Sequence, residues 1–238
     1  MKATAVRTRI LKRGEDLFDF IVEGTRPPSD ASILAVTSKI ASIAEERIVP
    51  KKDIEKLDLI KREADVYLGE IMAGVSLTIK EGLFIPSAGI DESNADGEYY
   101  ILYPERPADL TRLLWTRLKK HWGLKNFGLI LTDSHTHPLR RGVTGIALSS
   151  FGFDPVHELV GEPDLFGKPF KYSAVNVVDS LATTAALMMG EGKESSPLAW
   201  IESAPVRFKD VPETQVSIAM EKDLYLPIYK SLIEKSKR

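Results

Sequence analysis

The chain has 238 residues and no cysteine, and its 32 Lys and Arg residues against 34 Asp and Glu residues give a net charge of −2. This length suits one large domain or two small ones, and the lack of cysteine excludes disulfides, thiolate metal sites and cysteine nucleophiles. The near-neutral charge argues against a general nucleic-acid binder. No apolar run approaches the roughly 18 residues of a membrane span, and charged residues interrupt the amino terminus. We therefore expect a cytoplasmic protein, with no nucleic acid and no membrane as a partner.

In the first half of the chain, hydrophobic periodicity predicts strands and helices in mixed order. Asp16 is placed to cap a short helix, and Asp53 is placed to open a longer helix whose apolar face continues to Ile71. Strands are expected over residues 3–10, 32–37 and 98–103, and a hairpin is expected over residues 75–85.

The second half of the chain has the same mixed character. Pro107 suits the first turn of a helix that Gly123 ends, and Ser173 is expected to cap another helix that ends at Gly190. Pro227 is expected to interrupt the last helical stretch. Strands are expected over residues 127–132, 145–148 and 198–201, and the first of them is a nearly continuous apolar run typical of a buried central strand. Hairpins mixed with helices favour an α+β fold over a strictly alternating wound sheet.

The densest group of polar residues follows the apolar run at residues 127–132. Asp133 and Ser134 come where this strand is expected to end, and their oxygens suit Mg²⁺ or Mn²⁺. An Asx turn that caps a loop is the alternative interpretation. His135 and His137 have the spacing of two ligands on one edge of an extended segment, but zinc needs a third ligand that nothing nearby identifies. Surface or substrate contacts are the alternative role for these two histidines.

Two further loops combine small residues with polar and charged ones. Residues 86–94 form a small-residue turn that carries Asp91, and small residues let a ligand approach the backbone, although a plain polar loop is the alternative. Residues 189–197 contain glycines, an acid and a lysine, but their spacing fits neither a Walker A loop nor a dinucleotide fingerprint, and a helix C-cap explains Gly190. The residues alone thus indicate hard-oxygen ligands suited to metal-assisted chemistry on a phosphorylated substrate.

Five short motifs occur in a specific order between about residue 10 and residue 201. They read Ala88-Gly89-Ile90-Asp91-x-Ser93-Asn94; Thr132-Asp133-Ser134 with Pro138, Arg140 and Gly142; Asp164-x-x-Gly167; Asp179-x-x-Ala182; and Met189-Gly190. In this combination they resemble the motifs of the coenzyme F-420-0:γ-glutamyl ligases. The resemblance implies an α+β fold with two subdomains and an intertwined homodimer. It places the catalytic domain at residues 1–205 and leaves residues 206–238 as a C-terminal extension.

The same resemblance implies a ligase that uses GTP, two Mg²⁺ or Mn²⁺ ions and K⁺ to join L-glutamate to a carboxylate of F-420-0. Amide formation needs an activated acyl group, most simply an acyl phosphate. Arg140 would hold phosphate or carboxylate oxygens. The expected catalytic residues are Asp91, Asp133 and Arg140. The implied metal ligands are Asp91 and Asp133 for one ion, and Ser134 and Glu191 for the other. The implied nucleotide contacts are Ile10, Leu11, Lys12, Arg13, Ser38, Lys39, Asn94, Met189, Gly190, Gly192 and Lys193.

Three departures from the family pattern concern the acceptor and the phosphates. Residues 135–139 read His-Thr-His-Pro-Leu where the coenzyme enzymes usually have Phe-Gly-Arg-Pro-Trp, so we expect this segment to govern acceptor choice. Ile43 replaces a lysine, and Glu191 stands where glutamine is common. A folate-directed ligase of the same chemistry is therefore one alternative. A non-catalytic nucleotide- or metabolite-binding relative is another, although the retained acids argue against it.

Overall fold

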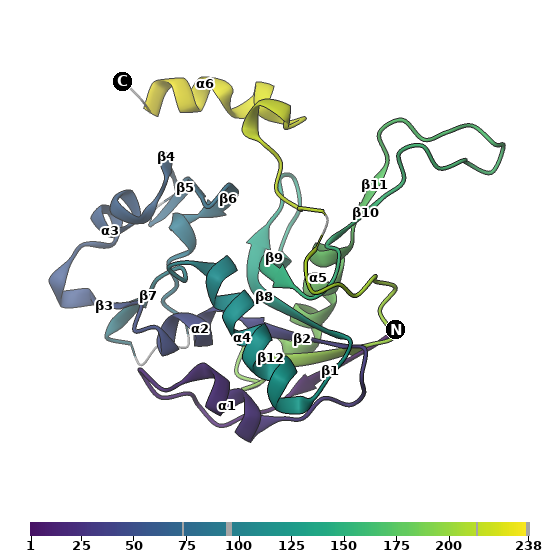
Figure 1. The fold of residues 1–238 in the computed structure, drawn as a ribbon. Coiled ribbons are helices and arrows are strands. Elements are labelled where there is room, and N and C mark those ends of the chain that lie inside the picture. Colours follow the sequence, from purple (N-terminus) through teal and green to yellow (C-terminus); the bar gives the residue numbers. More distant parts are fainter. Residues whose placement is uncertain (73, 94–96, 213, 237–238) are drawn as a thin grey trace.

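The structure, a computed structural model, describes residues 1–72, 74–93, 97–212 and 214–236. These residues build a central five-stranded sheet in the order β1–β12–β2–β8–β9 (Figure 1). The strands β2 and β8 run parallel, and the other neighbouring pairs are antiparallel. The bounds are Lys2–Val6 for β1, Ser32–Thr37 for β2, Phe127–Thr136 for β8, Val143–Phe151 for β9 and Leu198–Glu202 for β12. This mixed sheet with its helices confirms the expected α+β class.

Helices cover both faces of the central sheet. Leu34 and Val36 of β2 pack with helices α1 (Leu17–Gly24), α2 (Ser38–Ala44) and α4 (Pro107–Trp122). Ile33 and Ala35 of the same strand face the opposite way and pack with α5 (Val177–Met189). Because side chains alternate along a strand, burial of both faces requires a continuous apolar run in the central strands. This is why residues 127–132 were recognisable as a buried strand from the sequence.

Three helix ends follow their local sequence signals. The Oδ1 oxygen of Asp16 accepts hydrogen bonds from the backbone N–H groups of Phe18 at 2.8 Å and Asp19 at 3.1 Å, which confirms the predicted cap of α1. Pro107 is the first residue of α4, and Gly123 ends that helix in the left-handed conformation at φ 65°. These signals act within one turn of the helix, so they are readable without the tertiary fold.

Residues 48–101 form a smaller lobe, seen at the upper left in Figure 1. Its buried core contains Leu59, Ile60, Ile90, Tyr100 and Leu102. The strands β3 and β7 pair with each other, and β4, β5 and β6 form a three-stranded antiparallel sheet. The bounds are Ile48–Pro50 for β3, Lys56–Glu63 for α3, Val66–Met72 for β4, Val75–Lys80 for β5, Leu83–Pro86 for β6 and Tyr99–Ile101 for β7.

Two peripheral segments extend from this body. A hairpin arm with β10 (Val156–Glu158) and β11 (Ala174–Asn176) projects away from the sheet (Figure 1). The C-terminal helix α6 (Leu226–Ser236) packs on the small lobe, where the Tyr229 and Phe84 rings lie 4.8 Å apart. Before it, the backbone N–H of Asp154 donates to the Arg207 carbonyl oxygen and the N–H of Lys209 donates to the Gly152 carbonyl oxygen, which holds residues 207–209 against the central body. The C-terminal segment therefore contacts both parts of the molecule.

Among the helices of the described ranges, none has the length and apolar character needed to cross a bilayer.

The predicted long helix from Asp53 to Ile71 is wrong. The α-helix covers only Lys56–Glu63, and Tyr67, Leu68 and Ile71 lie in strand β4. The strand pairs with β5 through two register shifts, between Tyr67 and Gly69 and between Glu70 and Met72. Such bulges interrupt the alternation by which a strand is recognised in a sequence. The cross-strand partners, and not the local periodicity, decide the conformation here.

Other boundaries also differ from the expectation. The first strand ends at Val6 and not at residue 10, and α5 is capped by Asn176, whose Oδ1 accepts the N–H of Asp179 at 3.1 Å, and not by Ser173. Pro227 lies in the first turn of α6 and does not interrupt it, because a first-turn proline has no helical hydrogen bond to lose. The strand β8 continues to Thr136, so residues 133–136 belong to the strand and not to a loop.

Candidate functional site

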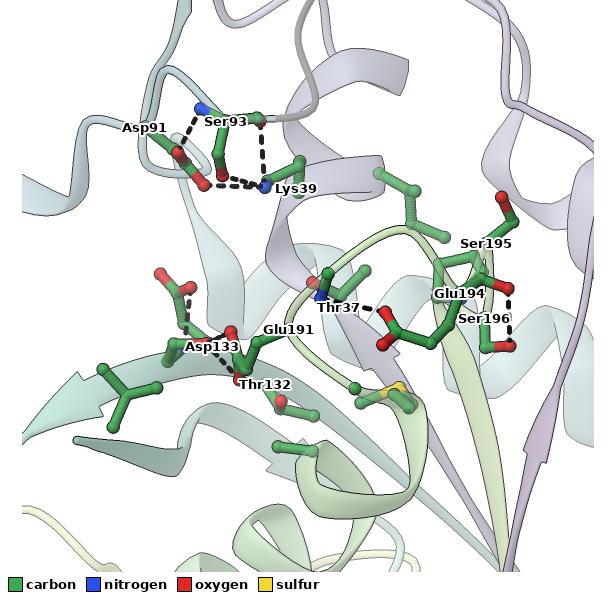
Figure 2. Close-up of a pocket in the computed structure, with 18 of the residues that line it drawn as sticks. Thr37, Lys39, Asp91, Ser93, Thr132, Asp133, Glu191, Glu194, Ser195 and Ser196 are labelled. Carbon is green, nitrogen blue, oxygen red and sulfur yellow. Dashed lines mark hydrogen bonds and ion pairs between the residues drawn. The ribbon is translucent and has the colours of Figure 1, made fainter.

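A pocket of about 650 Å³ lies between the central sheet and the small lobe (Figure 2). Its wall combines segments that are far apart in the sequence. Residues 8–11 follow β1, Thr37 ends β2, Lys39, Ile40 and Ile43 belong to α2, and Asp91 and Ser93 belong to the small lobe. Further wall residues come from the end of β8 and from the loop at residues 189–197 after α5. The fold thus brings all three polar motifs of the sequence to one cavity.

The end of β8 forms an open strand edge in this pocket. Thr37 is the last residue of β2 and pairs with Thr132, whereas β8 runs on to Thr136 without that neighbour. Side chains alternate along the strand, so Asp133 lies on the α2 side of the sheet and Ser134 on the α5 side. Both residues border the pocket because the strand that would have covered this edge has ended.

The hydroxyl of Ser134 meets the carboxylate of Glu191. Its Oγ lies 2.8 Å from each of the two carboxylate oxygens of Glu191. Glu191 follows Gly190, which ends α5. The length of α5 therefore brings Glu191 to β8, and the structure places together the two residues that the resemblance assigned to one metal ion.

Asp91 is paired with Lys39 of α2, which lies beside it in the pocket (Figure 2). The Lys39 Nζ lies 2.7 Å from Asp91 Oδ2, 3.0 Å from Ser93 Oγ and 3.1 Å from the Ser93 carbonyl oxygen. The backbone N–H of Ser93 donates to Asp91 Oδ1 at 2.6 Å. Burial alone would raise the pKa of Asp91, but the bonds from Lys39 and Ser93 outweigh it and hold the pKa below its ordinary value.

Asp133 has a very different environment. Among the described residues no ion pair involves this carboxylate, whose Oδ1 accepts the backbone N–H of Ser134 at 2.8 Å. Burial raises its pKa to about 6, although hydrogen bonds from the Ser134 N–H and the Ser38 hydroxyl oppose the rise; the charge of Asp91 adds to it and Lys39 lowers it. Asp133 is therefore a carboxylate that accepts hydrogen bonds but has no ion-pair partner among the described residues.

The donor set of this pocket suits divalent cations. Asp91, Asp133 and Glu191 contribute carboxylates, Ser134 contributes a hydroxyl, and Lys39 is paired with only one of the acids. Hard oxygens with an excess of negative charge are what Mg²⁺ and Mn²⁺ prefer. In the described parts of the chain no three His, Asp or Glu side chains are grouped to enclose one ion. Each ion would therefore also need hydroxyl, water or substrate oxygens.

The other predicted site residues divide into two groups. Ile10, Leu11, Lys39, Met189, Gly190, Gly192 and Lys193 line the pocket, and so does Ile43. Lys12, Arg13, Ser38 and Arg140 are not part of its wall: Arg13 pairs with Glu46 at 2.9 Å, Ser38 is buried, and Arg140 is exposed in the β8–β9 turn. Asn94 lies outside the described residues.

The sequence prediction missed several pocket residues. Arg9 lines the wall and forms ion pairs with Glu15 and Glu23, but residues 3–10 were expected to be a strand. Glu194 lies in the loop at residues 189–197 that the sequence had singled out; it lines the wall and accepts the N–H of Gly192 at 2.8 Å. Thr37 could have been found, because it directly precedes the predicted Ser38-Lys39 segment.

The segment at residues 135–139 is only partly in the pocket. Thr136 lines the wall, whereas Leu139 is fully exposed at the turn. The rings of His135 and His137 stand perpendicular with centroids 5.1 Å apart, and His137 Nε2 lies 2.7 Å from the hydroxyl oxygen of Thr144. Burial and the neighbouring His137 lower the pKa of His135. Among the described residues, no third metal-ligating side chain lies close enough to complete a metal site with these two histidines.

An α+β body with acids, a hydroxyl and a lysine around one cavity defines an enzyme that handles charged oxygens, and comparison with known proteins narrows this class. The family model of F420-0:γ-glutamyl ligase matches residues 5–203. A coenzyme F420:L-glutamate ligase of Methanopyrus kandleri is 32% identical over 206 residues, covering 79% of this chain and 81% of the relative. The enzyme of the same name from Methanothermobacter thermautotrophicus is 30% identical over 213 residues, covering 81% and 84%. The chain belongs to the F420-0:γ-glutamyl ligase family and is an amide-forming ligase.

Proposed function

We propose that this enzyme joins L-glutamate to a carboxylate of F420-0 or a closely similar acceptor, with GTP as the activating nucleotide. The observation that carries the proposal is the convergence of Asp91, Asp133, Ser134, Glu191 and Lys39 on one cavity of about 650 Å³. The names of the related enzymes support coenzyme F420 and L-glutamate as substrates. A non-catalytic binding protein would have little use for three carboxylates in one pocket.

The reaction that we propose has two steps. An oxygen of the acceptor carboxylate attacks the γ-phosphorus of the nucleotide, the bond to the β-phosphate oxygen breaks, and the nucleoside diphosphate leaves. The amine nitrogen of L-glutamate then attacks the acyl carbon, loses a proton and expels inorganic phosphate. Lys39 would bind a phosphate or carboxylate oxygen by exchanging one of the three oxygen acceptors that its Nζ now holds in the pocket.

The metal ligands that the family resemblance implies are part of this proposal. Asp91 and Asp133 would hold one divalent ion, and Ser134 and Glu191 a second. When bound, such ions neutralise phosphate charge and polarise the phosphoryl group. The lack of an ion-pair partner for Asp133 among the described residues supports the assignment, since a partly buried carboxylate without a cation partner is costly unless it binds one. The K⁺ requirement and the cytoplasmic location that the sequence suggested stay predictions.

A homodimer is also part of the proposal. The β10–β11 arm projects from the body and carries Leu165, Phe166 and Tyr172 with exposed fractions of 98%, 89% and 91% (Figure 1). Exposed apolar groups of this size are typical of association surfaces. Light scattering at micromolar concentration is expected to give twice the mass of one chain, and Leu165→Ser with Phe166→Ser is expected to reduce it. The mass of a single chain for the wild type would contradict the dimer.

The central test is a phosphate-release assay with purified protein. GTP or ATP, L-glutamate, Mg²⁺ or Mn²⁺, and a panel of deazaflavin and folate acceptors are combined and then omitted one at a time. We expect release to require all of the components, with GTP preferred, and mass spectrometry to find an acceptor enlarged by one glutamyl residue. Nucleotide hydrolysis that ignores both glutamate and acceptor would contradict the proposal. If product forms with a folate and with no deazaflavin, the acceptor is a folate and not F420-0.

A further inference from the structure

The Asp179-x-x-Ala182 motif lies on α5 but contributes nothing to the pocket wall. Two side chains of this helix bond instead to the backbone of the edge strand β9. An Asp179 carboxylate oxygen accepts the N–H of Ala147 at 2.9 Å, and the Thr183 hydroxyl donates to the carbonyl oxygen of Gly145 at 2.8 Å. These bonds attach β9 to the same helix that ends just before Glu191.

The strand residues held in this way stand opposite the predicted metal ligands. Gly145 pairs with Ser134 across the β8–β9 ladder, and Ile146 pairs with Asp133. The helix lies directly against Gly145: a Cβ there would be 2.4 Å from the carbonyl oxygen of Ala182, so only glycine fits. α5 therefore fixes β9 at the level of the two ligands.

A β-bulge lies beside this contact. The β8–β9 register shifts by one residue between Leu131 and Thr132, and Leu148 is the extra residue. Bulges bend a strand and re-aim the side chains next to them. Ala147 is the neighbour of Leu148, so the Asp179 carboxylate bonds the backbone at the bend. The bend comes immediately before the part of β8 that enters the pocket.

We propose that Asp179 and Thr183 are positioning residues that hold the bulged β8–β9 pair against α5, so that Ser134 meets Glu191 in the geometry a cation requires. This inference rests on the proposed function, because it concerns the ligands proposed there. Partners that orient ligands commonly change metal affinity or activity by about 10- to 100-fold when they are removed. The pair is called the α5 clamp below.

A hollow of about 330 Å³ beside the α5 clamp has its own polar lining. Its side chains are already bonded within the protein: His137 to Thr144, Asn176 to Asp179, and the Ser180 hydroxyl to the Asn176 carbonyl oxygen. These bonds lock Asn176 and Asp179 to each other at the start of α5. The hollow therefore lies beside the clamp, and its polar side chains are used to hold the start of α5.

Three substitutions on α5 separate positioning from simple packing. Thr183→Val removes the clamp hydroxyl and keeps the side-chain shape, and Thr183→Ser restores the hydroxyl. Thr184→Val is the matched control, because the Thr184 hydroxyl bonds the Ser180 carbonyl oxygen of its own helix at 2.8 Å. Calorimetry with Mn²⁺ is expected to show about 10-fold weaker binding for Thr183→Val, recovery for Thr183→Ser and no change for the control.

Amide hydrogen exchange tests the α5 clamp without metal, nucleotide or turnover. Exchange over residues 132–136 and 143–148 is expected to be about 10-fold faster in Thr183→Val than in Thr184→Val, and faster again in Asp179→Leu. Equal exchange and equal Mn²⁺ affinity in the two valine variants would overturn the inference. A wild-type protein that binds no Mn²⁺ would contradict the proposed metal site alone, and the exchange data would still decide whether the clamp holds β8.

Discussion

The two aspartates of the pocket have opposite electrostatics. Asp91, in the small lobe, receives an ion pair of 2.7 Å from Lys39, and its pKa is lowered. Asp133, in the central sheet, has no such partner among the described residues, and burial raises its pKa to about 6. The two carboxylates repel each other, and among the described residues Lys39 is the cationic side chain beside them. The comparison teaches that one acid of the pocket already has an ion-pair partner, whereas the other has none within the described parts of the chain.

Lys39 also connects two parts of the molecule. It belongs to α2 of the central body, and its acceptors Asp91 and Ser93 belong to the small lobe. A phosphate that drew Lys39 toward itself would free the Asp91 carboxylate for a metal ion. The difference between the two aspartates would then disappear in the substrate complex. The following predictions test this comparison in order of expected effect.

Asp133→Asn is expected to have the largest effect. It removes the negative charge of this side chain and should reduce turnover at least about a thousandfold, because an ordered divalent ion contributes several kcal/mol to phosphoryl transfer. The measurement is phosphate release at saturating Mg²⁺, with far-ultraviolet circular dichroism to confirm the fold. Asp109→Asn, at an exposed position of α4, is the control and should retain activity. Near-wild-type turnover of Asp133→Asn at ordinary Mg²⁺ would show that Asp133 is not a ligand.

Lys39→Met should weaken nucleotide binding by about 10- to 100-fold, the size of one or two lost charge-assisted hydrogen bonds. Without Lys39, Asp91 should resemble Asp133, with a pKa raised by burial. Nucleotide titration by calorimetry and a carboxylate titration by nuclear magnetic resonance measure the two effects. Lys51→Met is the matched control, because Lys51 pairs with Glu92 at 3.0 Å outside the pocket wall. Equal losses in both variants would rule out a specific role for Lys39.

The metal-free protein should become more stable when Asp133 is replaced by asparagine. The folded pKa of about 6 exceeds the ordinary value of 3.8, so the folded state binds more protons than the unfolded state between these values. The charge therefore costs stability above about pH 6, and the cost disappears below about pH 4. We expect a gain of about 1–3 kcal/mol near pH 7.5 in EDTA and none near pH 4, measured by denaturant unfolding. A gain that did not depend on pH would point to packing instead of charge.

The smallest effect is expected from the turn beside Asp133. Changing residues 135–139 to Phe-Gly-Arg-Pro-Trp should alter the acceptor KM by about tenfold at most, because Thr136 is the part of this segment that lines the pocket. Nucleotide affinity should stay unchanged, since Lys39 and the loop at residues 189–197 are untouched. Steady-state kinetics with each acceptor gives the KM, and calorimetry gives the nucleotide affinity. Loss of nucleotide or metal binding with unchanged acceptor preference would assign the segment to the catalytic part of the pocket.

The sequence by itself determined the features that depend on neighbouring residues. The cap at Asp16, the start of α4 at Pro107 and its end at Gly123 follow from side-chain and backbone geometry within one helical turn. The buried strands were recognisable because burial on two faces demands uninterrupted apolar residues. The motif at Asp133 and Ser134 indicated hard-oxygen chemistry, since it combines a carboxylate and a hydroxyl after such a strand.

Only the tertiary structure decided which residues meet. The early end of β2 exposes the edge of β8, the length of α5 brings Glu191 to Ser134, and Lys39 reaches Asp91 from the other lobe. These distances depend on chain segments separated by dozens of residues, which no local pattern encodes. The same reason explains the wrong helix: cross-strand pairing made residues 66–72 a strand against their helical appearance. Lys12, Arg13 and Arg140 are not among the residues that line the pocket, and their expected roles stay predictions. The pKa values of the two aspartates also depend on the tertiary structure. The contrast between Asp91 and Asp133 arises from burial and from partners that exist only once the chain has folded.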